Sequence, residues 1–384
     1  MVRRSFRVGT LAFLVLVTSL LAEDGKLSLV QAQALPVSEE TPVWERCQFV
    51  RADKAGRVFL LRCDNLQVYQ IFGNGGIVSR GKLRPAAPFD TASMFRDATM
   101  SPAGDAWAIL DFDFKVHLFR GGEEKPVPSF NWIPRVLAVP NGDLTALVFA
   151  EFAPMGKEIG PADRPRRLPP SPPFLLQLDG SEWRTLVEGE IPRFSEFRPG
   201  ISEEIRAAKE YWLAADAKGA LWVAARNVYR LMKYSPTGKP LTKIQIGDGQ
   251  VRLKERTEKE LQGARELGGN FSLPKMRAER VVRALTVGRD RRVYLVIDSA
   301  EGLALDRYDP DPVRNVVERV MVTGITADRM TVAAGANGLY VAALEGNRGR
   351  WVIPWETLDE ARWQAVPDVE IEDHPKDDQP PVAR

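Results

Sequence analysis

Short runs of alternating apolar and polar residues, separated by tight turns, recur along the whole chain. Each unit begins with an apolar strand, passes through a turn rich in Asp, Asn and Gly, and returns as a second apolar strand. Alternation of β-branched and aromatic residues around such a turn predicts a β-hairpin. Six copies lie at 49–59, 98–107, 137–144, 213–222, 285–294 and 332–340.

A second hairpin is predicted after each copy. The clearest has a strand at 228–234, a turn at 235–238 and a strand at 241–246. Six units of four antiparallel strands predict an all-β fold, a six-bladed β-propeller. Long helices are disfavoured by the spacing of 30 glycines and 28 prolines. The other second hairpins are expected at 66–78, 115–127, 174–187, 303–322 and 351–366.

The propeller is expected to span residues 35–366, with each unit supplying all four of its strands. Residues 35–44 would then be an extra edge strand or a clasp. The polar, Pro-rich segment 367–384 is predicted to be a disordered tail. A seventh blade would require the charged segment 250–279 to form strands, whereas residues 252–261 favour a surface helix.

Three insertions interrupt the repeat, and all three leave from one face of the predicted propeller, here called the upper face. Insertions in repeat proteins commonly mark the binding face, although loops between blades also tolerate insertions without any function. The insertions lie at about 151–173, 188–209 and 250–279.

The N-terminus has the pattern of a secretory signal peptide. Arg3, Arg4 and Arg7 precede an apolar run at 11–22, which is too short for a comfortable membrane span. We expect a signal peptide over residues 1–34, with cleavage after Ala22 or an uncleaved anchor as alternatives. No later segment is long and apolar enough to span a membrane, so the mature chain is expected to be periplasmic or secreted.

The two cysteines, Cys47 and Cys63, are symmetric about residue 55, which lies inside the first predicted turn. Strands that fold back over this turn would place the two residues opposite each other, at about the separation that a disulfide needs. Export would permit oxidation. We expect a structural disulfide, and the alternative is a pair of buried thiols.

Residues suited to catalysis are scarce. The chain has two histidines, His117 and His374, no glycine-rich phosphate loop and no spaced cysteine pairs. His117 lies in an alternating strand, where a structural imidazole is the more common occurrence. We therefore expect no catalytic residues, no protein-bound metal and no cofactor. A net charge of +2 gives no global field that would recruit nucleic acid.

Residues 230–238, with the sequence Arg-Leu-Met-Lys-Tyr-Ser-Pro-Thr-Gly, resemble the end of an NHL repeat. The units as a whole resemble the NHL and SMP-30-like (TolB-like) group of six-bladed propellers. The resemblance supports the fold better than any activity. It implies that a related hydrolase would hold a divalent cation at the axis, using Glu, Asn and Asp side chains from the innermost strands.

Alignment of the repeats on their turns places arginine at the start of the innermost strand in four of six blades. Such a ring would repel a cation and could bind an anion bidentately. Alternatively, each arginine pairs with an acidic residue of a neighbouring blade. Asp97, Glu210 and Asp328 lie one position away, so a register error of one residue would restore carboxylates. The aligned candidates for ligand binding are Gln48, Arg96, Arg135, Tyr211, Arg283 and Arg329.

These observations favour an exported binding or interaction module. Its expected partner is an anionic small molecule, an acidic glycan or a protein, bound at the upper face. One alternative is a metal-dependent hydrolase of the SMP-30 or gluconolactonase type, which would use a divalent cation. The other is a structural subunit of an envelope complex.

Overall fold

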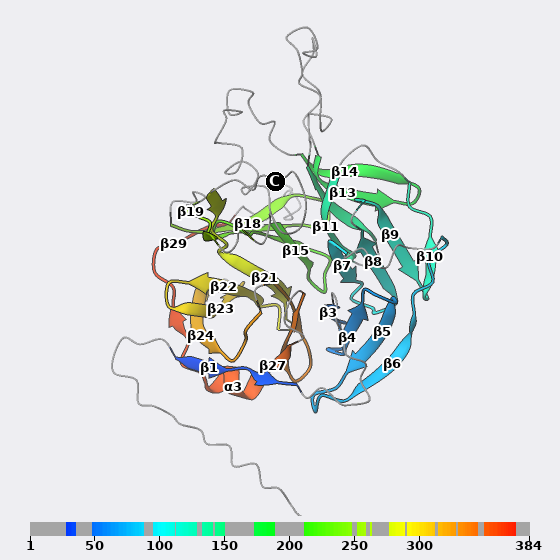
Figure 1. Ribbon diagram of the computed structural model, residues 1–384. Coiled ribbons are helices and arrows are strands. Elements are labelled where there is room, and N and C mark those ends of the chain that lie inside the picture. Colours follow the sequence, from blue (N-terminus) through cyan, green and yellow to red (C-terminus); the bar gives the residue numbers. More distant parts are fainter. Residues whose placement is uncertain are drawn as a thin grey trace, which may run out of the picture.

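Six small antiparallel sheets stand around a common axis and form a six-bladed β-propeller (Figure 1). Within each sheet, strands that follow one another along the chain lie side by side, from the axis outward. The computed structural model describes residues 28–35, 48–87, 95–111, 113–128, 133–140, 143–149, 173–188, 211–247, 252–258, 262, 276–288, 290–311, 314–327, 329–344 and 349–373.

The first three blades each take four consecutive strands. Blade one comprises β3 (Gln48–Ala52), β4 (Val58–Arg62), β5 (Gln67–Ile71) and β6 (Ile77–Lys82). Blade two comprises β7 (Asp97–Met100), β8 (Ala106–Leu110), β9 (Val116–Arg120) and β10 (Glu123–Lys125). Blade three comprises β11 (Ile133–Ala138), β12 (Thr145–Phe149), β13 (Pro173–Asp179) and β14 (Glu182–Glu188).

The last three blades carry additional strands from the ends of the chain. Blade four is built on β15 (Tyr211–Ala215), β16 (Leu221–Ala225), β17 (Arg230–Tyr234) and β18 (Pro240–Ile246). Blade five is built on β21 (Val282–Val287), β22 (Val293–Ser299), β23 (Gly302–Asp309) and β24 (Val316–Thr323). Blade six is built on β25 (Met330–Ala334), β26 (Gly338–Ala343) and β27 (Arg350–Pro354).

The tight turns between the first and second strands follow from the sequence. In blade one, the Asp53 Oδ1 atom accepts hydrogen bonds of 2.9 Å from the backbone N–H groups of Ala55 and Arg57. Asp216 binds the turn of blade four in the same way. A carboxylate that holds the backbone two and four residues ahead replaces the ladder bonds that the turn lacks.

Packing between blades accounts for the core. Every residue of β4, β8 and β16 is buried, because the second strand of a blade is covered by neighbouring blades on both of its faces. The largest fully buried side chains include Trp222 and Phe119. These continuous apolar segments explain why the repeat is visible in the sequence.

The ring closes with strands from both ends of the chain, which corrects the expectation that each unit supplies its own four strands. β2 (Gln33–Ala34) pairs antiparallel with β27 and is the outer strand of blade six. β1 (Leu29–Gln31) pairs parallel with β24 on blade five. Residues 29–34 therefore belong to the propeller, whereas the expected signal peptide extended to residue 34. Residues 1–27 and 36–44 lie outside the described residues.

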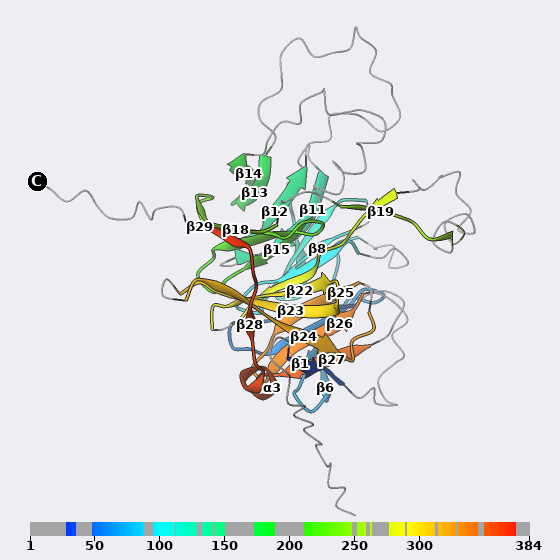
Figure 2. The ribbon, with the colours of Figure 1, turned by 90° about the vertical axis from the view of Figure 1, so that its left-hand side faces the viewer.

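The C-terminal segment folds back along the rim of the ring (Figure 2). After β27 the chain forms the helix α3 (Trp355–Glu360) instead of the expected hairpin over 351–366. It then adds β28 (Gln364–Ala365) to β24 and β29 (Val369–Asp373) to β18. The prediction of a disordered tail was wrong for residues 369–373, and residues 374–384 lie outside the described residues.

The insertion at 250–279 forms a strand at the start of the segment 252–261, where a helix was predicted, whereas Glu258 is helical and residues 259–261 lie outside the described residues. β19 (Leu253–Glu255) pairs antiparallel with β20 (Met276–Ala278) in a separate two-stranded sheet. This hairpin is not a seventh blade. Of the other two insertions, residues 151–172 and 189–209 lie outside the described residues.

The predicted register of the first hairpin is confirmed, since Gln48 pairs with Arg62 and Phe49 with Leu61. Cys63 is buried, but Cys47 lies outside the described residues, so the disulfide stays a prediction. Among the described residues, none of the helices has both the length and the apolar character needed to cross a membrane.

Candidate functional site

The six innermost strands, β3, β7, β11, β15, β21 and β25, enclose an axial cavity of about 350 Å³. Its lining begins at the level of Asp97 and Thr331 and continues to turn residues such as Lys54 and Ala217. The cavity therefore reaches the face that carries the first turns of the blades, here called the turn face. Apart from Asp97 in β7, the first residues of the inner strands, towards the upper face, are not part of the described lining.

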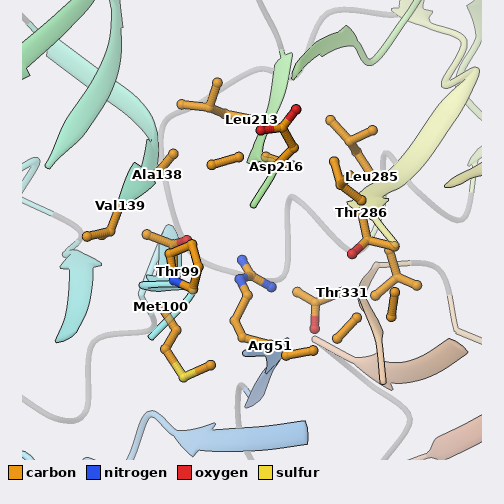
Figure 3. A pocket seen from close by; sticks show the side chains of 18 of the residues that line it. Arg51, Thr99, Met100, Ala138, Val139, Leu213, Asp216, Leu285, Thr286 and Thr331 are labelled. Atoms are coloured by element: carbon orange, nitrogen blue, oxygen red, sulfur yellow. The ribbon is translucent and has the colours of Figure 1, made fainter. Parts of the chain in front are cut away.

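The Arg51 guanidinium lies in the middle of this cavity (Figure 3). Its Nη2 atom is 3.3 Å from the Asp97 Oδ1 atom, and Nη1 donates a 2.8 Å hydrogen bond to the Val50 carbonyl oxygen. The second carboxylate oxygen of Asp97 accepts a 2.8 Å bond from the Leu137 backbone N–H. Among the described residues, Arg51 thus uses two of its five N–H groups, and the others are available to a ligand.

Burial dominates the electrostatics of this ion pair. The Asp97 side chain is 8% exposed and that of Arg51 is 21% exposed. Burial raises the pKa of Asp97, and the attraction of Arg51 lowers it only in part. Burial likewise lowers the pKa of Arg51, against the attraction of Asp97. The charged form of each group is therefore less stable in the cavity than in water. The attraction between the two groups offsets only part of this cost of burial.

Polar side chains at one repeat position tie three of the six inner strands to the next blade. This position lies four residues before the tight turn. The Thr331 Oγ1 atom accepts a 3.0 Å bond from the backbone N–H of Val50 on the next blade. Asp97 accepts the equivalent bond from blade three. Trp212 donates from its indole Nε1 to the Val282 carbonyl oxygen at 3.0 Å.

Most of the other side chains that line the cavity are apolar, although about half of the exposed cavity surface is polar. Three threonine hydroxyls lie among these side chains, at Thr99, Thr286 and Thr331. Apolar walls with a few convergent polar groups are typical of small-molecule sites. The apolar lining residues that Figure 3 labels are Met100, Ala138, Val139, Leu213 and Leu285.

The mouth on the turn face carries charges of both signs. Lys54, Asp53 and Asp216 line it. The Arg57 Nε atom lies 2.6 Å from Asp53 Oδ2. A 2.7 Å backbone bond from Lys54 to Pro102 joins the turns of blades one and two. The carboxylates at the mouth are thus held by local turn contacts, whereas Arg51 lies deeper and is directed into the cavity.

The six sequence-predicted residues are not brought together in this cavity. Arg96 stacks over the Phe114 ring, with 3.8 Å between the guanidinium carbon and the ring centroid. The Arg283 Nε atom lies 2.7 Å from the Asp298 carboxylate, and an Nη1 atom donates to a backbone carbonyl of the next blade. Arg283 therefore follows the alternative of an arginine paired with an acid, here within its own blade.

The other four predicted residues also lie outside the described lining. Tyr211 packs edge-to-face on Phe174, with ring centroids 5.3 Å apart. Arg329 is half-buried, and its carbonyl oxygen accepts a bond from the Leu344 N–H. Gln48 and Arg135 are placed only by their backbones, in β3 and β11.

Local bulges make the aligned column irregular at two of its six positions. The register of β11 shifts between Pro134 and Val136, and that of β21 shifts between Val282 and Ala284. Arg135 and Arg283 occupy these two irregular positions. A bulge re-aims its extra side chain relative to the rest of the strand, so spacing from the turn cannot place either arginine.

Sequence reasoning missed Arg51. The residue sits two positions before the tight turn, and the equivalent residues are Thr99, Ala214, Thr286 and Ala333. A single charge in a column of small residues is the signal that could have identified it. Asp97, noted only as a neighbour of the predicted column, is its partner.

The sequence-predicted structural role of His117 agrees with its contacts. Its Nδ1 atom lies 2.8 Å from a Glu124 carboxylate oxygen, and Nε2 lies 3.1 Å from an Asp111 carboxylate oxygen. These contacts tie β9 to β10 and to the turn after β8. The described residues contain no group of three or more His, Cys, Asp or Glu side chains suited to a metal ion.

No family model and no curated protein matches the sequence. Among solved structures, a streptogramin B lyase is 10% identical, covers 85% of this chain and 97% of its own, and has a TM-score of 0.43. Regucalcin from Agrobacterium tumefaciens, a calcium-binding protein, is 13% identical, with coverages of 85% and 95% and a TM-score of 0.43. Virginiamycin B lyase from Staphylococcus aureus is 13% identical, with coverages of 84% and 98% and a TM-score of 0.42. The assignment of a six-bladed β-propeller rests on the six sheets themselves and not on these likenesses.

Proposed function

We propose that this propeller is a binding module for a small organic anion, held in the axial cavity by Arg51. The observation that carries the proposal is a partly buried guanidinium directed into a cavity whose other side chains are mostly apolar. Guanidinium groups bind carboxylates, sulfonates and phosphates through paired hydrogen bonds. The ligand chemistry is the one expected from the sequence, but the site lies on the axis and opens at the turn face.

The cavity also restricts the body of the ligand. About 350 Å³ lies at the lower end of the range of small-molecule sites. Leucine, valine and alanine side chains favour an apolar body, and the threonine hydroxyls supply a few polar contacts. A monoanion with a compact apolar body fits this lining better than a polyanion, because Arg51 is the one cation deep in the part of the cavity that the structure describes.

The hydrolase alternative is less well supported. A divalent cation on the axis would lie close to the Arg51 guanidinium and be repelled by it. The carboxylate nearest to that position, Asp97, is already bound by Arg51 and by a backbone N–H. Export of the chain, and docking of a protein partner at the upper face, are further proposals that these contacts do not address.

Binding of matched anionic and neutral probes tests the proposal. Sulfonates remain ionised at all ordinary pH values, so methane-, butane-, benzene- and naphthalenesulfonate form a size series with constant charge. Benzenesulfonamide is the neutral counterpart of one member. Isothermal titration calorimetry is expected to show binding of at least one sulfonate and at least tenfold weaker binding of the sulfonamide.

The variant for this experiment replaces both members of the ion pair, Arg51→Met with Asp97→Asn, so that no buried charge remains alone. The control is Arg292→Met, which breaks a pair with Asp309 on blade five, away from the cavity lining. Loss of sulfonate binding in the double variant alone supports the proposal. Equal binding by all three proteins would refute it.

A further inference from the structure

We propose that ligand binding in the axial cavity is coupled to the uptake of one proton by Asp97, which releases Arg51 to the incoming anion. This inference rests on the proposed function and specifies how the same site is regulated. It follows from the geometry of the pair, because the group that binds the ligand is already bound to a carboxylate of the protein.

The first step of the argument is competition for one cation. Arg51 Nη2 lies 3.3 Å from Asp97, and the other Arg51 amino group donates to the Val50 carbonyl oxygen. A ligand anion that approaches the guanidinium would lie close to an ionised Asp97. Two anions that share one partly buried cation repel each other strongly, because burial of the pair limits screening by solvent.

The second step is that a proton resolves this conflict without moving the backbone. A neutral Asp97 carboxyl gains an O–H donor, which can point towards the bound anion. Its other oxygen keeps the 2.8 Å bond from the Leu137 N–H, so the link between blades two and three is retained. Charge balances, since one anion and one proton enter together and the cavity keeps its net charge.

The surroundings of Asp97 favour its protonation. Burial already raises the pKa of Asp97 in the ligand-free protein, in which Arg51 still attracts the ionised form. An anion that takes over Arg51 removes part of that attraction and raises the pKa further. Like-charge pairs of this kind are a common way to shift carboxyl titration.

Other charges in the cavity do not provide the same coupling. Lys54, Asp53 and Asp216 line the mouth, with Asp53 bound to Arg57 and Asp216 bound to backbone N–H groups of its turn. Two neighbouring strands contact the Asp97 carboxylate in the part of the chain that the structure describes. These are β3, through the Arg51 guanidinium, and β11, through the Leu137 N–H.

The test measures the affinity for benzenesulfonate between pH 5 and 8 by titration calorimetry. The probe keeps its charge throughout, so a pH dependence reports on the protein. For the wild-type chain we expect affinity to fall by up to tenfold per pH unit above the pKa of ligand-free Asp97. Repeating the titration in buffers of different ionisation enthalpy is expected to show uptake of up to one proton per ligand.

The Asp97→Asn variant gives the decisive comparison. The amide can keep an acceptor for the Leu137 N–H, but it neither competes as an anion nor titrates. We expect its affinity to be independent of pH and at least tenfold higher than that of the wild type at pH 8. Parallel profiles for the two proteins, or the absence of proton uptake, would overturn the coupling.

Failure of the coupling is distinguishable from failure of the proposed function. Binding that is lost in the Arg51→Met and Asp97→Asn double variant, yet shows no pH dependence, would reject only the coupling. Binding that survives in the double variant, or that is absent from the wild type and from Asp97→Asn at every pH, would reject the anion site and the coupling together.

Discussion

Individual side chains on the inner strands perform two tasks, and the sequence distinguishes them poorly. The side chain four positions before the turn forms a hydrogen bond with the backbone of the next blade in three cases, Asp97, Thr331 and Trp212. Position two before the turn brings Arg51 into the cavity. Both positions lie on the same face of one alternating strand, and in blades two, four and six both line the cavity. The sequence therefore predicted a charged site at the starts of the inner strands, whereas the arginine that lines the described cavity is Arg51.

A buried ion pair on blade five provides a test of stability at the same scale. Asp306 is fully buried and accepts bonds of 2.6 and 2.8 Å from the Nε and Nη2 atoms of Arg319. Asp306→Asn leaves a buried guanidinium without its counter-charge, so we expect a loss of about 3 kcal/mol in the free energy of unfolding. The measurement is urea denaturation.

The adjacent rung of the same two strands supplies the control. Arg307 pairs with Glu318 at 2.7 Å, and both side chains are more exposed to solvent than Asp306. Glu318→Gln is expected to cost less than about 1 kcal/mol. Equal losses for the two variants would show that burial does not determine the strength of these pairs.

The raised pKa of Asp97 also predicts how stability depends on pH. Because burial raises the pKa in the folded state, the folded chain takes up this proton at a higher pH than the unfolded chain. The contribution of Asp97 to stability therefore increases as pH falls through the folded pKa and levels off below about 3.9, the ordinary value.

Asp97→Asn lacks this titration. The difference in unfolding free energy, wild type minus variant, is expected to rise as the pH is lowered from 7 to 4. Urea denaturation at one-unit intervals measures it. A difference that stays constant, or one that falls towards pH 4, contradicts the burial of an ionisable Asp97.

Elements with strong local signals were predictable, and those held mainly by partners were not. The inner hairpins have Asp or Gly turns with fully buried second strands, such as β4 and β16, and their positions were confirmed. β2 has two exposed residues and β29 reads as an acidic tail. Neither forms a strand by its own composition, since each depends on the open edge of a blade that it meets.

The predicted disulfide would join the two strands of the first hairpin in blade one. Gln48 pairs with Arg62, so continuation of this register by one residue would place Cys47 opposite Cys63. Denatured protein prepared without reductant is expected to show no thiols that react with a maleimide, and two after reduction, as counted by mass spectrometry. Such a bond would stabilise the chain by about 3 kcal/mol, the value for a loop of roughly 15 residues.

Two reactive thiols before reduction would contradict this prediction. The Cys63→Ala variant distinguishes the stability contributed by the disulfide from that contributed by packing of the Cys63 side chain. If the disulfide exists, the wild-type chain is expected to be more stable when oxidised than when reduced, whereas the variant is expected to be equally stable under both conditions.

At the scale of the whole molecule, both ends of the chain fasten the ring on the same side. The backbone of Ser28 bonds Met321 on blade five, and its hydroxyl accepts a 3.4 Å bond from the Arg362 N–H. Blades four, five and six thus receive strands from the ends of the chain along their outer edges, whereas the first three blades rely on their own hairpins.

Truncation tests this closure. A chain that starts after Ala22 keeps β1 and β2 and is expected to unfold at the same urea concentration as the full chain. A chain that starts after Ala34 loses the buried Val30 and the bonds of both strands. We expect it to be less stable by at least about 3 kcal/mol. Equal midpoints would show that the ring holds without its N-terminal strands.

The pairing of β2 with β27 has a consequence for how the protein is made. Gln33 leaves the ribosome about 320 residues before its partner Val352. At about 5–20 residues per second, the early segment waits roughly 15 to 65 s for that partner. During synthesis the nascent chain therefore carries an unmatched apolar segment around Val30, and a chaperone that shields it until release would raise the yield of closed rings.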